Sequence, residues 1–270
     1  MTKKNRIRHK KRIRVDRLIV LLIIFAAMIT AIFYGCSLLF HLLFPAKPAE
    51  ETATPSTTSP AVTSSPDEQE EENPELYDPN SILFCANKKH PLPDNYQPSD
   101  LVYVNVTQTH GDTTLRKEAA DAMIAMFDAA KADGVTLVLG SGFRDQAYQT
   151  NLYNMYVAQS GQEYADSISS RPGYSEHQTG LAADIKAPDD GTFLDETFIN
   201  TPQGQWLYNN AYRFGWILRY PEGKEDITGY DYEPWHYRYV GIETATAMHN
   251  IDPNLTFEEY FNIEGGTYTE

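Results

Sequence analysis

Two short stretches carry most of the information in this chain: Ser175-Glu-His-Gln-Thr-Gly-Leu-Ala-Ala-Asp184 and Glu233-Pro-Trp-His-Tyr237. They offer His177, His236 and Asp184 as metal ligands, with Glu233 as a further carboxylate. A catalytic zinc ion takes three protein ligands of these kinds and leaves its fourth position to water. The spare carboxylate can take a proton from that water. The two stretches therefore predict a zinc hydrolase, provided that the fold brings them together.

The pattern around these stretches predicts short strands and amphipathic helices. Apolar residues recur at three- to four-residue spacing over 115–131, which predicts a helix that stops at Gly134. Further helices are expected over 145–158 and 201–214, and strands over 135–139, 181–185, 216–220 and 235–240. Helices and strands do not alternate regularly, so the expected fold class is α+β rather than a doubly wound sheet.

The candidate ligands come from different predicted elements. His177 is expected in a Gly/Ser-rich loop, Asp184 on the strand after it, and His236 at the start of another strand. Glu233 precedes His236 by three residues and can lie beside a metal without binding it. Any single histidine is more often an ordinary core or surface residue. The argument therefore depends on the combination of the four residues.

These residues match a known pattern. Ser175-x-His177-x-x-Gly180-x-Ala182-x-Asp184, followed by Glu233-x-Trp235-His236, resembles the signature of the VanY-type D-alanyl-D-alanine carboxypeptidases. These bacterial zinc peptidases are related to the VanX dipeptidases and the LdcB-type LD-carboxypeptidases. Upstream, Ser141-Gly-Phe-Arg144 with Gln149 and Leu152, and the stretch from Asn87 to Pro93, are similar to the same family. The resemblance covers about residues 85–245.

The resemblance implies a fold and a set of roles. The fold would be a small antiparallel sheet with flanking helices, of the hedgehog/DD-peptidase-like kind. His177, Asp184 and His236 would bind Zn²⁺ and Glu233 would be the catalytic base, in agreement with the reading from the residues alone. Arg144 would bind the carboxylate at the end of the substrate, and Gln149 and Ser175 would add hydrogen bonds around it.

Each of these substrate-binding roles has a structural alternative. A guanidinium grips a carboxylate with two parallel hydrogen bonds, which suits Arg144 to recognition of a chain end. The same side chain would otherwise form a surface salt bridge. Gln149 would otherwise be an ordinary residue on a helix face, and Ser175 would only cap the loop around His177.

The N-terminal region predicts a membrane anchor. Residues 1–17 hold nine Lys or Arg and one acidic residue, and residues 18–44 hold no charged residue. Those 27 residues exceed the roughly 20 apolar residues that span a bilayer, and the basic flank favours a cytoplasmic N-terminus. A cleaved signal peptide and a lipoprotein site at Cys36 are the alternatives. A signal peptide has a shorter apolar core. The stretch Phe33-Tyr34-Gly35-Cys36 puts a bulky Tyr where a lipoprotein site usually carries a small residue.

The remaining sequence divides into a tether and a domain. Residues 45–80 are rich in Pro, Thr and Ser and then acidic, which predicts a disordered linker. Residues 81–270 form the predicted zinc carboxypeptidase domain. This order places the catalytic domain on the extracellular, cell-wall side of a single-pass membrane protein.

Charge and cysteine content exclude other classes. The formal net charge is −15, and because the first 17 residues carry +8, residues 18–270 carry −23. A nucleic-acid partner requires a basic surface, so none is expected. Cys85 is the single cysteine outside the apolar run, so a disulfide within the domain is excluded. The sequence implies no protein partner.

The functional expectation follows from the motifs and the topology together. It is a membrane-anchored zinc carboxypeptidase that removes the C-terminal D-Ala from peptidoglycan stem peptides. An LD-carboxypeptidase acting on the tetrapeptide carries the same motif and stays open. A non-catalytic cell-wall binding module with a structural zinc is a further alternative, although closed structural sites use four protein ligands.

Overall fold

The computed structural model describes residues 73–109, 113–188 and 194–269. The basic tail over 1–17, the apolar run over 18–44 and the first part of the linker lie outside these ranges, and their roles stay predictions. Within the described ranges, no helix has the length and apolar character needed to cross a bilayer.

The folded domain begins earlier than the sequence predicts. Residues 73–80, assigned above to the disordered linker, include a 3₁₀ helix, η1 (Pro74–Leu76). Leu76 is buried in a cluster with Cys85, Ile217 and Val240, so it belongs to the core of the domain. One apolar residue in a polar stretch is too weak a pattern to reveal this contact from sequence.

A four-stranded antiparallel sheet forms the centre of the domain. Its strands lie in the order β3 (Val138–Ser141), β4 (Ala182–Lys186), β6 (His236–Tyr239) and β5 (Trp216–Leu218). A separate antiparallel pair joins β1 (Leu101–Tyr103) to β2 (Thr114–Arg116). The α+β class and the small antiparallel sheets agree with the expectation.

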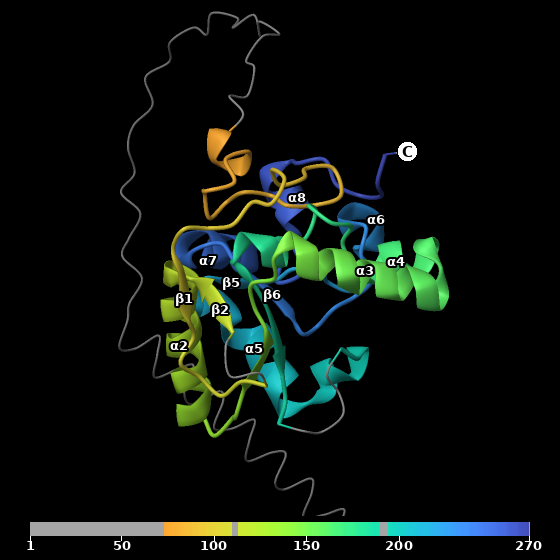
Figure 1. The fold of residues 1–270 in the computed structure, drawn as a ribbon. Helices are drawn as coiled ribbons and strands as arrows, with labels where there is room; N and C mark the ends of the chain where they lie inside the picture. The colour runs from red at the N-terminus through yellow and green to blue at the C-terminus, as the bar shows by residue number, and fades with distance from the viewer. Residues whose placement is uncertain (1–72, 110–112, 189–193, 270) are drawn as a thin grey trace, which may run out of the picture. The chain divides into compact units, whose positions relative to one another are not determined.

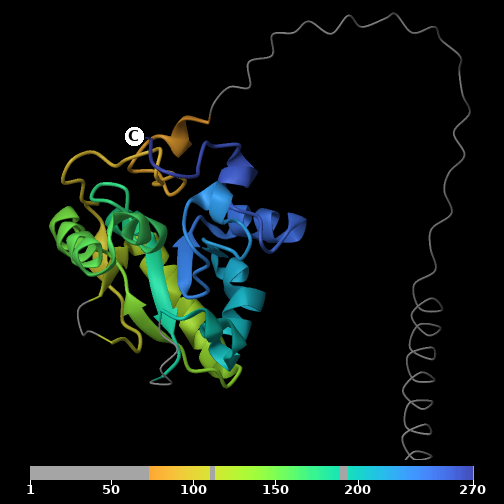
Figure 2. The ribbon, with the colours of Figure 1, turned by 90° about the vertical axis from the view of Figure 1, so that its right-hand side faces the viewer.

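Helices surround this sheet. The helix predicted over 115–131 is α2, at Lys117–Ala132, and the next predicted helix is α3, at Gln146–Ser160. Figures 1 and 2 show α2 on one side of the central sheet and the α3–α4 pair on the other. The remaining helical elements are α4 (Gln162–Ile168), η2 (Glu176–Thr179), η3 (Glu196–Asn200), α5 (Pro202–Asn210), η4 (Ala211–Phe214), α6 (Glu225–Thr228), α7 (Ile242–Ile251) and α8 (Phe257–Phe261).

The two faces of the central sheet have different chemistry. Side chains alternate between the faces of a strand. In β4, Ala183 and Ile185 pack into the main hydrophobic core with Met123 and Phe127 of α2. Asp184 therefore points to the opposite face. In β6, Tyr237 and Tyr239 likewise join the core, which places His236 on the same face as Asp184.

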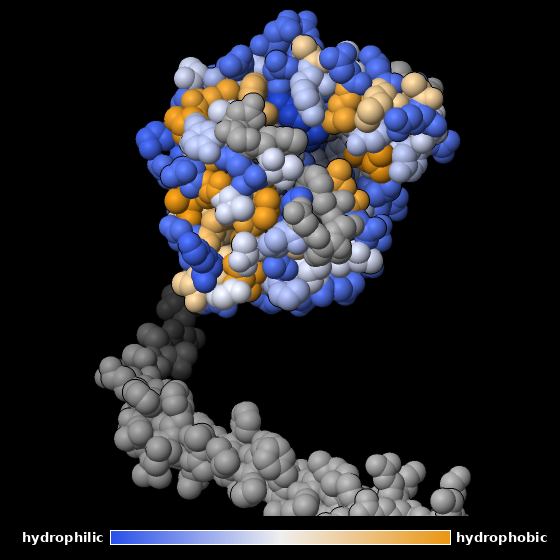
Figure 3. Space-filling model, turned by 60° about the horizontal axis from the view of Figure 1, so that its bottom comes forward, coloured by the Kyte–Doolittle hydropathy of each residue, from blue (hydrophilic) through white to orange (hydrophobic). Residues whose placement is uncertain are grey.

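The outer surface is mixed in character. On the face seen in Figure 3, hydrophobic residues are interspersed with hydrophilic ones. Of the aromatic residues in the predicted elements, Trp206, Trp216 and Tyr237 belong to the core. Tyr220 does not belong to this core cluster; it lines the cavity beside His177, Asp184 and His236.

Candidate active site

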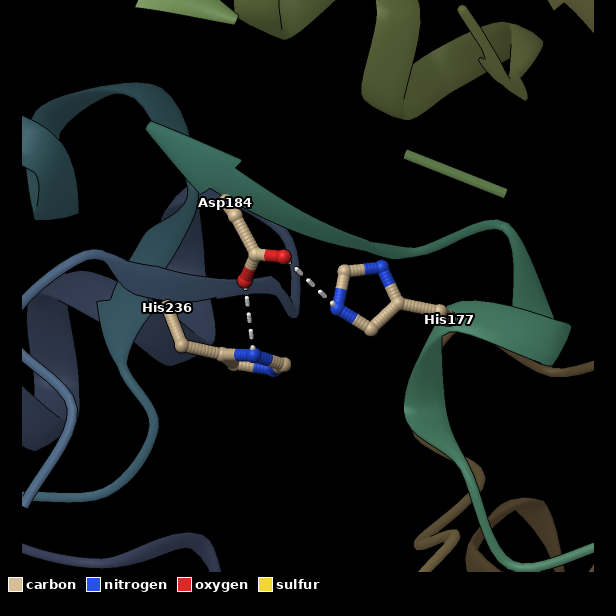
Figure 4. Close-up of side chains that lie close together, drawn as sticks. All are labelled: His177, Asp184 and His236. Carbon is tan, nitrogen blue, oxygen red and sulfur yellow. Dashed lines mark ion pairs between the residues drawn. The ribbon is translucent and has the colours of Figure 1, made fainter. Parts of the chain in front are cut away.

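Strand pairing brings Asp184 and His236 together. The two residues are direct partners in the β4–β6 ladder, and their side chains share one face of the sheet. His236 Nδ1 lies 3.1 Å from Asp184 Oδ1. His177 approaches from the other side, with its Nε2 atom 3.4 Å from Asp184 Oδ2. Figure 4 shows the three side chains converging from η2, β4 and β6.

Two glycines make this approach possible. His177 lies in the 3₁₀ helix η2 rather than in an open loop, and Gly180 ends that helix in the left-handed conformation, with φ 68°. Gly142 lets the β3 end pack closely, because a Cβ atom there would lie 2.6 Å from the Thr114 carbonyl oxygen. The Gly142 carbonyl oxygen is 2.7 Å from His177 Nδ1. A proton on Nδ1 leaves the Nε2 lone pair directed at Asp184.

The three residues form a group that can hold a metal ion. One ligand atom from each lies within 4.8 Å of the others, and all three residues are buried. His177 Nε2 is a buried atom without a hydrogen-bond partner in the described part of the chain. A buried nitrogen of this kind is costly unless something binds it. Two imidazoles and one carboxylate are the donors that a catalytic zinc site uses, so the donor set fits zinc.

The electrostatics of the two imidazoles differ. Burial, and after it the positive charge of Arg144, lowers the pKa of His177 to about 4, so this ring is neutral at physiological pH. Burial alone would lower the pKa of His236, but the carboxylates of Asp184 and Glu176 raise it to about 9. A metal ion bound at His236 would have to displace the proton that this raised pKa favours on the ring.

Glu233 lies at the edge of this group. Its Oε2 atom is 3.5 Å from His236 Nδ1, and it is not one of the three residues in the candidate metal group. Burial raises the pKa of Glu233 to about 8. A carboxyl group with its pKa near neutrality can both accept and return a proton.

Arg144 follows β3, and its side chain points towards the group formed by His177, Asp184 and His236. Its Nη2 atom is 3.9 Å from Asp184 Oδ2, and its Nε atom is buried without a hydrogen-bond partner in the described ranges. A long contact of this kind is not a closed salt bridge, so the guanidinium is free to bind another carboxylate.

Gln149 and Ser175 both line the cavity beside the metal group. Gln149 is buried rather than on an open helix face, and its Nε2 donates to Ser170 O over 2.8 Å. Its Oε1 atom has no partner within the described residues. Ser175 occupies the N-cap position of η2, but its side chain makes no capping hydrogen bond. The Ser175 side chain therefore does not cap η2.

The cavity extends well beyond the metal group. Its volume is about 580 Å³, which exceeds the space that a single terminal residue would fill. Aromatic side chains form much of its wall, and the Tyr220 ring lies 4.8 Å from the His236 ring. The lining residues include Tyr156, Tyr164, Tyr230, Tyr232 and Trp235.

A buried charge network behind the site was not predicted from the sequence. The Glu176 side chain is fully buried, and its Oε1 atom accepts from Arg219 Nε over 2.7 Å and from Arg238 Nη1 over 2.8 Å. Arg219 also binds both carboxylate oxygens of Glu258 in α8. The sequence did contain a signal for this network. Arg219 and Arg238 lie in the predicted strands over 216–220 and 235–240, which consist mainly of aromatic and apolar residues.

The chain is similar to known carboxypeptidases. The family described as VanY, D-alanyl-D-alanine carboxypeptidase, matches residues 112–242. The chain is 46% identical over 190 residues to YodJ of Bacillus subtilis, across 69% of each protein. The family match covers all seven candidate site residues.

Solved structures agree with this assignment. The structure of the LdcB LD-carboxypeptidase matches with a TM-score of 0.64 and 45% identity, over 69% of this chain and 89% of that one. A D,D-pentapeptidase VanY variant in complex with Zn(II) matches with a TM-score of 0.56 and 36% identity, over 67% of this chain and 99% of that one. The geometry and these matches lead to one conclusion: this chain is a zinc carboxypeptidase and belongs to the VanY family.

Proposed function

We propose that this protein is a D-alanyl-D-alanine carboxypeptidase that removes the terminal D-Ala from peptidoglycan stem peptides. The observation that carries the proposal is the placement of Arg144 beside the group formed by His177, Asp184 and His236. A guanidinium at that distance from a metal site can bind the free carboxylate at the end of a peptide. This binding places the last peptide bond of the chain at the metal.

The proposed roles follow from the geometry. His177, Asp184 and His236 would hold zinc, which when bound activates a water molecule and stabilises negative charge on the substrate oxygen. Glu233 accepts a proton and returns it to the leaving amine. Arg144 binds the terminal carboxylate. Gln149 Oε1 accepts a hydrogen bond from a substrate N–H group, and Ser175 lines the same wall.

The LD-carboxypeptidase activity is the second candidate. The specific observation in its favour is identity: 45% with the LdcB structure, against 36% with the VanY structure. Both activities require the same metal group and the same arginine. They differ in the residue on the amine side of the bond, which is D-Ala in one case and the L-residue at position three in the other.

One experiment separates the two activities. The purified full-length chain is incubated with pentapeptide and, separately, with tetrapeptide, and the products are identified by mass spectrometry with and without EDTA. Release of D-Ala from pentapeptide alone supports the proposal. Cleavage of the tetrapeptide with untouched pentapeptide would replace it by the LD activity. No cleavage of either substrate would contradict both.

We also propose that residues 18–44 anchor the protein in the cell membrane, with the catalytic domain on the cell-wall side. The support is the uncharged run and its basic flank. The test is gel mobility of the mature membrane-bound protein. Loss of roughly 3–4 kDa would contradict an uncleaved anchor and favour processing near Cys36.

A further inference from the structure

We propose that Tyr268, in the C-terminal segment after α8, is a positioning residue for substrate binding. It would act through residues 169–175, a segment of which Ser169, Ser170 and Ser175 form part of the wall of the active-site cavity. The proposal rests on the proposed function, because that wall matters to catalysis only if a stem peptide binds in this cavity. Residue 268 also lies beyond residues 112–242, the part of the chain that the family matches.

The cavity side of residues 169–175 carries binding groups. Ser169, Ser170 and Ser175 line the cavity. Gln149 holds the start of the segment, since its Nε2 donates to Ser169 Oγ over 3.1 Å and to Ser170 O over 2.8 Å. The orientation of the Gln149 Oε1 acceptor therefore depends on where this segment lies.

Tyr268 holds the same segment from behind. The Arg171 backbone N–H donates to Tyr268 Oη over 2.8 Å. The Arg171 guanidinium lies 4.1 Å from the centre of the Tyr268 ring, within the range of a cation–π contact. The Tyr174 ring packs edge-on against Tyr268, with centroids 5.1 Å apart. One side chain thus contacts residues three positions apart in the segment.

A second tyrosine continues the contact to the cavity. Tyr230 Oη lies 3.5 Å from Tyr268 Oη and 2.8 Å from Ser170 Oγ. Both Ser170 and Tyr230 line the cavity. The chain of contacts from Tyr268 therefore reaches the wall at Ser170 through side chains as well as through the Arg171 backbone.

The C-terminal segment that carries Tyr268 is held in a defined position by backbone contacts. The Gly266 N–H donates to Ile227 O over 2.7 Å. This position of the segment requires glycine at residue 229, because a Cβ atom there would lie 2.3 Å from Gly266 O. Lys88 is buried beneath it, with Nζ 4.1 Å from the Tyr230 ring centre and 5.2 Å from the Tyr268 ring centre. The Lys88 ammonium donates to Asp166 O over 2.6 Å and to Gly229 O.

The metal group is held independently of Tyr268. His177 is fixed by the Gly142 carbonyl, and Asp184 and His236 by strand pairing. Loss of Tyr268 should therefore loosen the substrate wall and leave the zinc ligands in place. The expected kinetic signature is a raised KM with little change in kcat, which is the pattern for lost binding that is equal in the ground and transition states.

The test uses Tyr268→Ala and Tyr268→Phe in the full-length chain, with Tyr103→Ala as the control. Tyr103 is an exposed tyrosine on β1, and it is not among the residues that line the cavity. On the stem peptide that the wild type cleaves, Tyr268→Ala should raise KM by about tenfold with kcat within about twofold and zinc content unchanged. Tyr268→Phe keeps the ring contacts and loses the acceptor for the Arg171 N–H, so a smaller rise is expected.

Hydrogen exchange supplies a readout that does not need activity. The amides of residues 169–175 should exchange faster in both Tyr268 variants than in the wild type, and should be unchanged in Tyr103→Ala. Unchanged exchange in this segment, or a lowered thermal midpoint with unaltered KM, would overturn the proposal. Absence of peptidase activity in the wild type would instead overturn the proposed function. If Tyr268→Ala does not fold, Tyr268→Phe decides between these outcomes.

Discussion

The carboxylate of Glu176 faces the imidazole of His236, although the two residues lie on different elements. Glu176 Oε2 is 3.6 Å from His236 Nε2, and both atoms are buried. This contact favours a proton on Nε2 and leaves Nδ1 directed at Asp184 and Glu233. Carboxylates that orient a metal-binding histidine in this way tune the site without touching the ion.

Loss of one proposed zinc ligand should abolish metal binding and activity together. In His236→Ala, only two of the three donors remain, so zinc affinity should fall by more than the 10- to 100-fold typical of changes around the ligands. Metal content after dialysis against a weak chelator measures this. His249→Ala is the matched control, because His249 stacks on Tyr212, and neither residue lines the active-site cavity. Equal zinc retention in the two variants would contradict the proposed ligand set.

Glu233→Gln should separate metal binding from catalysis. Glutamine keeps the size of the side chain but cannot accept and return a proton. A rate loss of roughly 10²- to 10⁴-fold in kcat is expected, because general acid–base catalysis contributes about that much. Zinc content should equal that of the wild type. The idea fails if Glu233→Gln retains the wild-type kcat, or if it loses the metal.

Arg144 should distinguish a peptide with a free C-terminal carboxylate from one with a C-terminal amide. Arg144→Lys keeps the charge but lacks the planar fork, so kcat/KM on the natural acid should fall by roughly 10- to 100-fold. The wild type should discriminate strongly against the same peptide with a C-terminal amide. In Arg144→Lys, the ratio between acid and amide should shrink. An unchanged ratio would assign Arg144 to structure rather than recognition.

Glu176 should make the domain sensitive to acid. Burial alone would raise the pKa of Glu176, but the guanidiniums of Arg219 and Arg238 hold that pKa well below the usual range. The unfolded chain then binds a proton below about pH 4.5 while the folded state does not, so the free energy of unfolding falls as pH is lowered. The stabilising effect of the charge is fully present above that pH.

Denaturant titration of Glu176→Gln measures this effect. At pH 7 the variant should lose about 3 kcal/mol of unfolding free energy, because it breaks a buried ion pair. Below pH 4.5 the gap to the wild type should narrow by roughly 1.4 kcal/mol per pH unit. Glu243→Gln, at an exposed position, serves as control and should follow the wild type. A gap that does not depend on pH would show that folding does not shift the pKa of Glu176.

Local patterns in the sequence were sufficient to predict much of this site. His177, Asp184 and His236 could be chosen because each lies in a motif whose spacing is set by one turn or one strand. The strand ladder that pairs Asp184 with His236 then brings the motifs together. The α+β class followed from the same periodicities.

The unpredicted contacts join distant parts of the chain. Glu176 and Glu258 are 82 positions apart in sequence, yet both bind Arg219. No periodicity connects them, and each one alone looks like a surface glutamate. Leu76 and Tyr268 are similar cases, because the residues that each one contacts are far away in sequence and are revealed only by the fold. The tertiary contacts of single residues leave no repeating trace in the sequence.

The Arg219–Glu258 pair has a practical consequence for dividing this protein. A fragment cut at residue 242, where the family match ends, would still contain the seven candidate site residues, although it would lack Tyr268. It would nevertheless leave the fully buried Arg219 guanidinium with Glu176 but without Glu258, a defect that typically costs about 3–5 kcal/mol. The shortest fragment that can be expressed as a working enzyme should therefore extend through α8.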